Sequence, residues 1–217
     1  TDSPTLAITA KAKKMKAGGQ DVISLSIGEP DFPTPRHIVE AAKNALDQGA
    51  TKYTPAASIP ELRSAVAEAI TRSHELTGIT EEHVIISAGA KHSIYNAMMA
   101  ILNPGDEVII PAPYWLSYPV IVTLASGIPV FVPTTLEERF VLTPEKLRAA
   151  ITRRTRMLIL NNPSNPTGTV YNRRELKALW DVIEDHPNIM VLSDDIYGKL
   201  IYGGGKFSSV ASFSDEA

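Results

Sequence analysis

Short apolar runs alternate with amphipathic stretches along most of the chain, and this alternation constrains the fold more than any other feature. The apolar runs have the length and composition of buried strands, and the stretches between them show helical spacing of apolar residues. Strands separated by helices predict an α/β fold, a mostly parallel sheet with helices on both faces. The predicted strands are residues 22–27, 83–88, 107–112, 127–133, 156–160 and 188–193. The predicted helices are residues 35–48, 59–76, 91–102, 115–125, 143–151 and 172–185.

The composition is that of a globular protein without a strongly charged partner. Of the 217 residues, 44% are hydrophobic and 21% are charged, and the net charge is −3. This balance argues against nucleic-acid binding, and no apolar run is long enough to span a membrane. The chain has no cysteine, which excludes disulfides, thiolate metal sites and a cysteine nucleophile. This fits the reducing cytoplasm, where we expect the protein to work.

The first 35 residues lack the strand–helix alternation. They contain the densest basic run of the chain, KAKKMK at 11–16, which we interpret as a solvated helix face. We predict an N-terminal arm and small-domain segment at residues 1–35 and a large ligand-binding domain at residues 36–217. No internal repeat or low-complexity segment divides the chain further.

Four of the loops that follow predicted strands carry unusual residues. Ligands of open α/β sheets bind at the carboxyl ends of the strands, so we expect these loops to converge on one edge of the sheet. Their sequences are SAGAKHS at 87–93, PAPYW at 111–115, NNPSNPTG at 161–168 and SDDIY at 193–197.

Three of these loops have a chemical interpretation and a plainer one. The turn before Lys91 exposes backbone N–H groups at a helix start, which suits an anion such as phosphate, or it is only a tight turn. Trp115 can stack on a planar ring or pack on the core. Asp194 can face a cationic ring nitrogen, with Tyr197 sharing the site, or cap a turn. The five histidines form no metal-binding pattern, and no dinucleotide fingerprint or P-loop occurs.

The loop at 161–168 is unusually rigid for a connector. It holds three asparagines, two prolines and one glycine in eight residues. Proline fixes the backbone, and asparagine tolerates unusual backbone angles. A plain link between a strand and a helix needs no such rigidity, so we expect the loop to hold part of the chain in a fixed position.

Taken in order, six stretches resemble the class I aminotransferases of fold type I, and most closely the bacterial aspartate aminotransferase branch. They are SLSIGEPDFPTP, KYTPAASIPELR, SAGAKHS, PAPYW, NNPSNPTG and SDDIY, and the resemblance covers essentially the whole chain. It implies the large domain of that fold, a mostly parallel sheet sandwiched by helices. It also implies pyridoxal 5′-phosphate (PLP) as the cofactor, and transamination between aspartate or glutamate and a 2-oxo acid.

The resemblance implies roles for single residues around the cofactor ring. Asp194 is similar to the aspartate that pairs with the pyridine nitrogen and keeps it protonated, so that the ring can accept electrons. Asn165 and Tyr197 resemble the pair that contacts the ring 3′-oxygen, and a cis Asn–Pro bond fits that loop. Trp115 resembles the aromatic residue that stacks on the ring. The implied catalytic residues are Asp194 and Tyr197.

Other implied roles concern the phosphate and the substrate. Ala90 and Lys91 match the positions whose backbone amides meet the phosphate, and Tyr53 resembles a tyrosine that reaches it from the neighbouring subunit of a homodimer. Gly28 matches the glycine beside the substrate carboxylate. Lys91 also resembles a lysine associated with the distal carboxylate of the substrate, although its plainer interpretation is a solvated lysine at a helix start. The implied substrate-binding residues are Gly28, Lys91, Trp115 and Asn165.

The chain departs from the family pattern in two places. The family's Schiff-base lysine and the arginine that grips the substrate α-carboxylate lie past residue 217, so we expect the N-terminal part of a longer protein, inactive alone. An incomplete sheet leaves unpaired edges, and we expect these residues alone to be marginally stable or to aggregate. Ser58 stands where relatives usually carry glycine, and a turn with positive φ strains a serine.

Other functions stay open from the sequence alone. Within the same fold, the chain suits an aromatic or alanine aminotransferase, or another PLP enzyme such as a lyase. A non-catalytic binding protein that kept the PLP fold is an alternative from a different class. The missing glycine fingerprint disfavours a nucleotide-binding domain.

Overall fold

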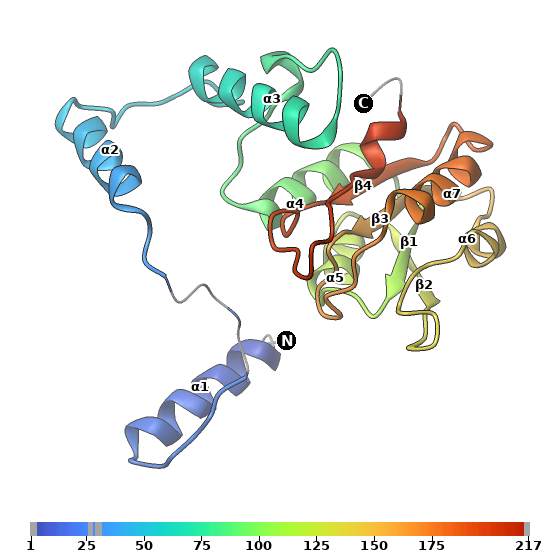
Figure 1. Cartoon of the computed structure of the whole chain (residues 1–217), viewed down its shortest axis with the longest axis horizontal. Helices are drawn as coiled ribbons and strands as arrows, with labels where there is room; N and C mark the ends of the chain where they lie inside the picture. The colour runs from blue at the N-terminus through green and yellow to red at the C-terminus, as the bar shows by residue number, and fades with distance from the viewer. Residues whose placement is uncertain (1–3, 26–27, 29–31, 215–217) are drawn as a thin grey trace. The chain divides into compact units, whose positions relative to one another are not determined.

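Figure 1 shows the computed structural model of the chain, which describes residues 4–25, 28 and 32–214. The chain divides into two units, Thr1–Tyr53 and Thr54–Ala217, each with its own set of contacts. The arm and large domain predicted at 1–35 and 36–217 are not tested by this division, and that boundary stays a prediction.

The N-terminal unit contains two helices and no buried residue among those described. Helix α1 spans Pro4–Ala17 and helix α2 spans Arg36–Asp47. α2 ends just before Gly49, whose φ of 81° is typical of the residue that follows a helix. The strand predicted at 22–27 is wrong for residues 22–25, which pair with no strand in the described ranges, and residues 26–27 lie outside those ranges.

The second unit is built on a parallel four-stranded sheet. Strands β1 (Glu107–Ala112), β2 (Ile128–Pro133), β3 (Thr155–Asn161) and β4 (Met190–Asp194) lie in the order β2-β1-β3-β4. All three pairings are parallel, which confirms the predicted α/β fold. The carboxyl ends of the strands therefore meet at one edge, where the last register pair of β3 and β4 joins Asn161 to Asp194.

Helices connect and cover the strands as the alternation predicts. They are α3 (Pro60–His74), α4 (Ala90–Ile101), α5 (Ser117–Leu124), α6 (Pro144–Ala150) and α7 (Arg173–Glu184), with two short 3-10 helices, η1 (Glu81–His83) and η2 (Val210–Phe213). Thr143 caps α6 before a proline, and Asn172 and Glu175 form a reciprocal capping box on α7. The turn before α3 has a φ of 91° at Ser58, a conformation that strains a serine.

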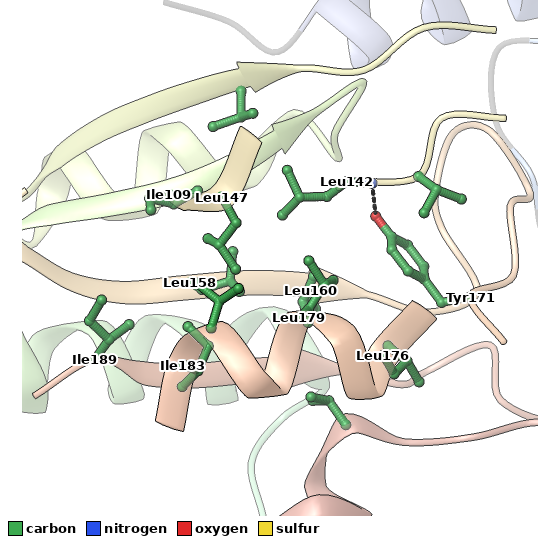
Figure 2. Packing of buried hydrophobic residues seen from close by; sticks show 14 residues of the cluster. Ile109, Leu142, Leu147, Leu158, Leu160, Tyr171, Leu176, Leu179, Ile183 and Ile189 are labelled. Carbon is green, nitrogen blue, oxygen red and sulfur yellow. Dashed lines mark hydrogen bonds between the residues drawn. The ribbon is translucent and has the colours of Figure 1, made fainter. Parts of the chain in front are cut away.

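Hydrophobic side chains fill both faces of the sheet, because alternate residues of a strand point to opposite sides. The face covered by α6 and α7 is formed by Ile109, Leu158 and Leu160. The face covered by α4 and α5 is formed by Val108, Ile110, Met157 and Ile159. Figure 2 shows the first cluster, in which Leu147 of α6 and Leu179 of α7 meet the strand residues. Burying each leucine or isoleucine side chain completely stabilises the fold by about 1.5–3 kcal/mol, so these layers hold the strands in place.

The strand predicted at 83–88 is wrong. The segment is extended at Val84, but its backbone contacts the turn and helix before it: the Ile86 amide donates to Ala57 O at 3.2 Å, and Arg63 Nε donates to Val84 O at 2.9 Å. A strand needs a paired neighbour, and within the described residues none pairs with this segment. His83 ends the 3-10 helix η1, so the predicted strand is extended at Val84 but begins in a helical turn and has no partner.

The described ranges hold neither a bilayer-crossing helix nor a metal-binding cluster. None of their helices combines the length and the apolar character that crossing a membrane requires. No group of three or more histidine, aspartate or glutamate side chains in these ranges is placed to share a metal ion.

Candidate functional site

The carboxyl edge of the sheet brings together side chains from the four unusual loops. β4 ends in Asp194, and β3 ends at Asn161, the first residue of the 161–168 loop. Helix α4 begins within the 87–93 loop, and α5 begins shortly after the 111–115 loop. Contacts run from Lys91 to Trp115, from Trp115 to Tyr118 and from Tyr118 to Asp194, and Asn161 contacts the Asp194 carbonyl. The predicted convergence of the loops is therefore confirmed.

Asp194 is half-buried at the end of β4, where its carboxylate is held by one strong hydrogen bond. The Tyr118 hydroxyl donates to Oδ2 at 2.6 Å, and the Ile196 amide lies 3.4 Å from Oδ1. Burial, and after it the charge of Asp194, raises the pKa of Tyr118 far above its usual value, so this hydroxyl stays a donor.

The charge of Asp194 has no cationic partner among the described residues. None of their ion pairs includes this carboxylate. A half-buried carboxylate is costly unless a cation or several donors compensate its charge. Asp194 is therefore suited to bind a ligand that brings a positive charge.

The 161–168 loop places Asn165 beside Tyr197. The Asn165 Nδ2 lies 3.5 Å from the Tyr197 Oη, at the long limit of a hydrogen bond. Both Asn–Pro peptide bonds of the loop are cis, where one such bond was expected. The Asn165 amide N–H donates to Asn161 Oδ1 at 2.7 Å, which ties the loop to the end of β3. Asn165 and Tyr197 are thus neighbours, while their roles toward a cofactor stay predictions.

Trp115 contacts two other side chains of this edge. Its ring meets the Tyr118 ring edge-on, with centroids 5.3 Å apart. The Lys91 ammonium lies 5.0 Å from the centroid of the indole, a cation–π distance. Trp115 is half-buried and Lys91 is exposed, so both side chains are accessible to a ligand in this chain.

The start of α4 offers two free backbone donors. Gly89 precedes the helix with a φ of 86°, a conformation in which any side chain is strained. The amides of His92 and Ser93 donate to Gly89 O, whereas those of Ala90 and Lys91 donate to no acceptor in the described part of the chain. Free donors at a helix start suit an anion.

Two residues of the predicted site belong to the N-terminal unit. Tyr53 is fully exposed, and Gly28 is exposed between residues 26–27 and 29–31, which lie outside the described ranges. Neither residue is part of the unit that carries the sheet edge. The roles expected for Gly28 beside a substrate carboxylate and for Tyr53 in a neighbouring subunit therefore stay predictions.

The residues of the sheet edge fit the cofactor that the resemblance implies. The free amides at the start of α4 suit a phosphate, and the indole of Trp115 suits a flat ring. The uncompensated carboxylate of Asp194 suits a protonated ring nitrogen, and Asn165 supplies an amide donor for a ring oxygen.

Sequence reasoning missed Tyr118 and Asn161, which orient the predicted site residues. Tyr118 follows Trp115 by three residues, a spacing that brings side chains together near a helix start. Asn161 contacts both Asn165 and the Asp194 carbonyl. The first of these had a local signal in the sequence, while the second depends on strand register.

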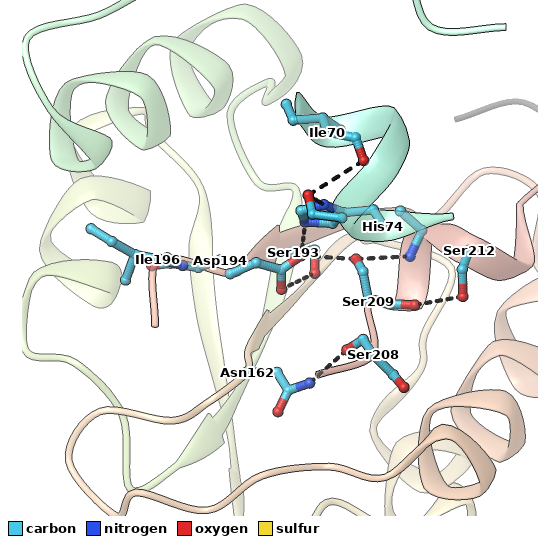
Figure 3. Close-up of polar contacts among 12 residues, drawn as sticks. Ile70, His74, Asn162, Ser193, Asp194, Ile196, Ser208, Ser209 and Ser212 are labelled. Carbon is cyan, nitrogen blue, oxygen red and sulfur yellow. Dashed lines mark hydrogen bonds and ion pairs between the residues drawn. The ribbon is translucent and has the colours of Figure 1, made fainter. Parts of the chain in front are cut away.

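Asp195, the neighbour of Asp194, is occupied by groups of the chain itself. Its carboxylate accepts hydrogen bonds from the hydroxyls of Ser193 at 2.7 Å and Ser209 at 2.8 Å, and the His74 Nε2 lies 3.2 Å away (Figure 3). Because His74 ends α3, this cluster ties α3 to the end of β4. The two adjacent aspartates thus have different partners, a distinction that the sequence alone did not make.

Comparisons with known proteins agree with this arrangement. The family model described as aminotransferase class I and II matches residues 20–217. The chain is 50% identical to the aspartate aminotransferase of Bacillus sp. (strain YM-2) over 216 residues, which cover 100% of this chain and 55% of that protein. It is 51% identical to the aspartate/prephenate aminotransferase of Cereibacter sphaeroides over 209 residues, which cover 96% of this chain and 52% of that protein.

Solved structures give the same result. The aspartate aminotransferase from Thermus thermophilus with maleate matches with a TM-score of 0.93 at 47% identity, over 98% of this chain and 55% of that one. The aspartate aminotransferase from Rhizobium meliloti matches with a TM-score of 0.93 at 44% identity, over 99% of this chain and 53% of that one. The chain therefore spans about half the length of the relatives it matches.

Proposed function

The chain belongs to the family of class I and II aminotransferases, and from this premise we propose that the whole protein transfers an amino group between aspartate or glutamate and a 2-oxo acid. Members of this family use PLP as their cofactor. The observation that carries the proposal is the Asp194 carboxylate, which is half-buried, oriented by Tyr118 and unpaired with any cation of the described residues.

When bound, PLP supplies an electron-accepting ring that stabilises the negative charge left when an amino acid loses its Cα proton. In this proposal Asp194 holds a proton at the ring nitrogen, and Tyr118 fixes the direction of that carboxylate. Asn165 and Tyr197 contact the ring oxygen, and Trp115 covers one face of the ring and excludes water from it.

The phosphate end of the cofactor is assigned to the start of α4. The amides of Ala90 and Lys91 are the two donors there without a protein acceptor in the described ranges, and the positive end of a helix dipole adds to their attraction for an anion. Held at both ends, the ring has one orientation against Asp194, which is the positioning that such chemistry requires.

Lys91 is the proposed determinant of an acidic substrate. Its ammonium is exposed and 5.0 Å from the Trp115 ring, where a compact positive charge suits a carboxylate. The similar structure from Thermus thermophilus contains maleate, a dicarboxylate, and the relatives are named for aspartate or for aspartate and prephenate. These names support an acidic substrate over the aromatic and alanine alternatives.

We also propose a homodimer in which Tyr53 reaches the neighbouring site, and a cytoplasmic location. The full exposure of Tyr53 supports a partner for this side chain outside its own unit. Analytical ultracentrifugation of the whole protein tests the dimer, and cell fractionation tests the location.

The proposed function is tested on the full-length protein supplied with PLP. A visible absorption band and a coupled transaminase assay over aspartate, glutamate, prephenate, alanine and phenylalanine are the two readouts. We expect the highest kcat/KM for the acidic substrates. Lys91→Met lowers that value about tenfold or more, because a hydrogen-bonded charge pair is lost, and leaves neutral substrates nearly unchanged. Lys13→Met, at an exposed position of α1, is the matched control.

Three outcomes would count against the proposed function. A protein that shows the band without turnover supports the non-catalytic binder. A preference for alanine or phenylalanine supports the alternative aminotransferases of the same fold. The absence of any band removes the cofactor assignment itself.

A further inference from the structure

We propose that Asn161 is a positioning residue that holds Asn165 in fixed register with Asp194, a role that rests on the function proposed above. Asn161 is the last residue of β3, and its register partner in β4 is Asp194. The side chain of Asn161 links the end of β4 to the loop that follows β3.

The amide of Asn161 makes two hydrogen bonds of opposite polarity. Its Nδ2 donates to the Asp194 carbonyl at 2.8 Å, and its Oδ1 accepts the Asn165 amide N–H at 2.7 Å. Both partners are backbone groups, one able only to accept and the other only to donate, so the orientation of the amide is determined. Aspartate lacks the donor and leucine lacks both groups, so among side chains of this size asparagine meets both demands.

This bridge matters because backbone pairing stops at this point. The Asn162 amide donates to the Asp194 carbonyl at 3.1 Å, and no later backbone hydrogen bond joins the loop to β4 in the described ranges. Asn165 lies beyond that bond, and Asn161 connects its backbone to β4. The Asn165 amide and the Asp194 carboxylate are the two groups proposed to contact the cofactor ring. Both are therefore positioned relative to the end of β4.

Asn162 provides a matched comparison within the same loop. It is the same residue type and 2% exposed, but its side chain binds other segments: Nδ2 donates to Ser208 O at 2.9 Å (Figure 3), and Oδ1 accepts the Tyr171 amide at 2.9 Å. These bonds anchor the loop to the rest of the unit. Asn162 therefore serves stability, and Asn161 serves the geometry of the site.

The expected effect follows from the donor role of Asn165. A donor at the ring oxygen favours its deprotonated form, so displacing Asn165 moves the pH midpoint of the bound cofactor's absorption change upward. Asn161→Leu removes both bridging hydrogen bonds at nearly equal size. We expect the midpoint to rise by up to about one unit and kcat/KM to fall about tenfold to a hundredfold.

The experiment compares four variants of the full-length PLP-loaded protein with wild type: Asn161→Leu, Asn165→Ala, their double variant and Asn162→Ala. Absorbance titration gives the midpoint, and steady-state kinetics and thermal melting are measured alongside. The double variant shifts no further than Asn165→Ala, because the two residues act as one unit. Asn162→Ala lowers the melting temperature more than Asn161→Leu does, and leaves the midpoint unchanged.

Three results would overturn the proposal: an unshifted midpoint in Asn161→Leu, additive shifts in the double variant, or an equal shift in Asn162→Ala. If Asn162→Ala does not fold, the coupling between Asn161→Leu and Asn165→Ala decides alone. If the wild-type protein shows no cofactor band, both the proposed function and this inference are wrong. If wild type shows the band but the midpoint of Asn161→Leu is unshifted, only this inference is wrong.

Discussion

At the amino-terminal edge of the sheet, Glu107 begins β1 and is only 5% exposed. The Thr152 hydroxyl donates to it at 2.5 Å, and Arg154 forms an ion pair with it at 2.5 Å. At the carboxyl edge, Asp194 ends β4 with the Tyr118 hydroxyl at 2.6 Å and no cation among the described residues. Glu107 is buried and Asp194 is half-buried, and only Glu107 has a cation of the chain beside it.

This difference separates a carboxylate that serves stability from one that is available to a ligand. The Thr152 hydrogen bond, and after it Arg154, hold the pKa of Glu107 below its ordinary value in spite of burial. Asp194 accepts a hydrogen bond from the Tyr118 hydroxyl but forms no ion pair with a cation of the described residues. We therefore propose that the cation for Asp194 comes with the cofactor, as the protonated ring nitrogen of PLP.

The largest effect is expected from replacing the carboxylate that meets the ligand. In the full-length protein, Asp194→Asn keeps the size of the side chain and loses its charge. We expect kcat/KM to fall about 10²- to 10³-fold, the cost of leaving a shielded charge without its partner. The free energy of unfolding of the cofactor-free protein changes by about 1 kcal/mol or less, because the amide oxygen still accepts from Tyr118. A large loss of stability with unchanged activity would show that Asp194 serves stability and not the ligand.

The same chemical change at the other edge gives the matched control. Glu107→Gln removes the ion pair with Arg154, and we expect the free energy of unfolding to fall by about 1–3 kcal/mol. The kcat/KM of the folded protein stays within about twofold, since the two edges are at opposite ends of the strands. Urea denaturation and the transaminase assay measure the two effects. A loss of kcat/KM close to that of Asp194→Asn would show that Glu107 and Asp194 do not differ in role.

The contribution of Glu107 to stability is expected to depend on pH. Because the folded pKa of Glu107 is lowered from its ordinary 4.5, its stabilising contribution is complete above that value and is lost as the pH falls through the lower folded pKa. The stability gap between wild type and Glu107→Gln is therefore wide at neutral pH and closes below about pH 4. Urea titrations across this range measure it. A gap that widens on acidification would show that Glu107 is not stabilised as a carboxylate.

A smaller effect is expected from the hydroxyl that orients Asp194. Tyr118→Phe keeps the ring that contacts Trp115 and removes the hydrogen bond to the carboxylate. We expect kcat/KM to fall about tenfold and PLP to bind a few times more weakly, since one hydrogen bond to a charged group is lost. Kinetics and PLP titration of the cofactor-free protein test this. A loss as large as that of Asp194→Asn would mean that Tyr118 contacts the reacting groups itself.

Local signals were enough to predict most elements of the sheet unit. The apolar runs of β1 and β3 and the capping residues Asn172 and Glu175 of α7 lie within a few positions of the structures they specify. The segment at 83–88 has the same apolar character as those strands, but its backbone contacts Ala57 and Arg63 instead of a strand. Composition predicts an extended segment, and only tertiary structure decides whether it has a partner.

Site residues that lie in short sequence motifs could be predicted. Contacts between site residues that are far apart in the sequence could not. Asn165 and Asp194 were identified within short patterns. The contact of Asn161 with Asp194 spans 33 positions, and that of Tyr118 with Asp194 spans 76. Both depend on strand register and helix placement, which no local pattern contains. Gly28 and Tyr53 stay predictions from the resemblance alone.

The pairing of Asp194 with the cofactor is measured by the protonation state of the PLP ring nitrogen in the full-length protein, followed by nitrogen NMR with isotope-labelled cofactor. With Asp194 present, we expect a protonated ring nitrogen at neutral pH, and in Asp194→Asn we expect a neutral one, while Glu107→Gln matches wild type. A ring nitrogen that is neutral in wild type, or that stays protonated in Asp194→Asn, would show that the carboxylate of Asp194 does not pair with it.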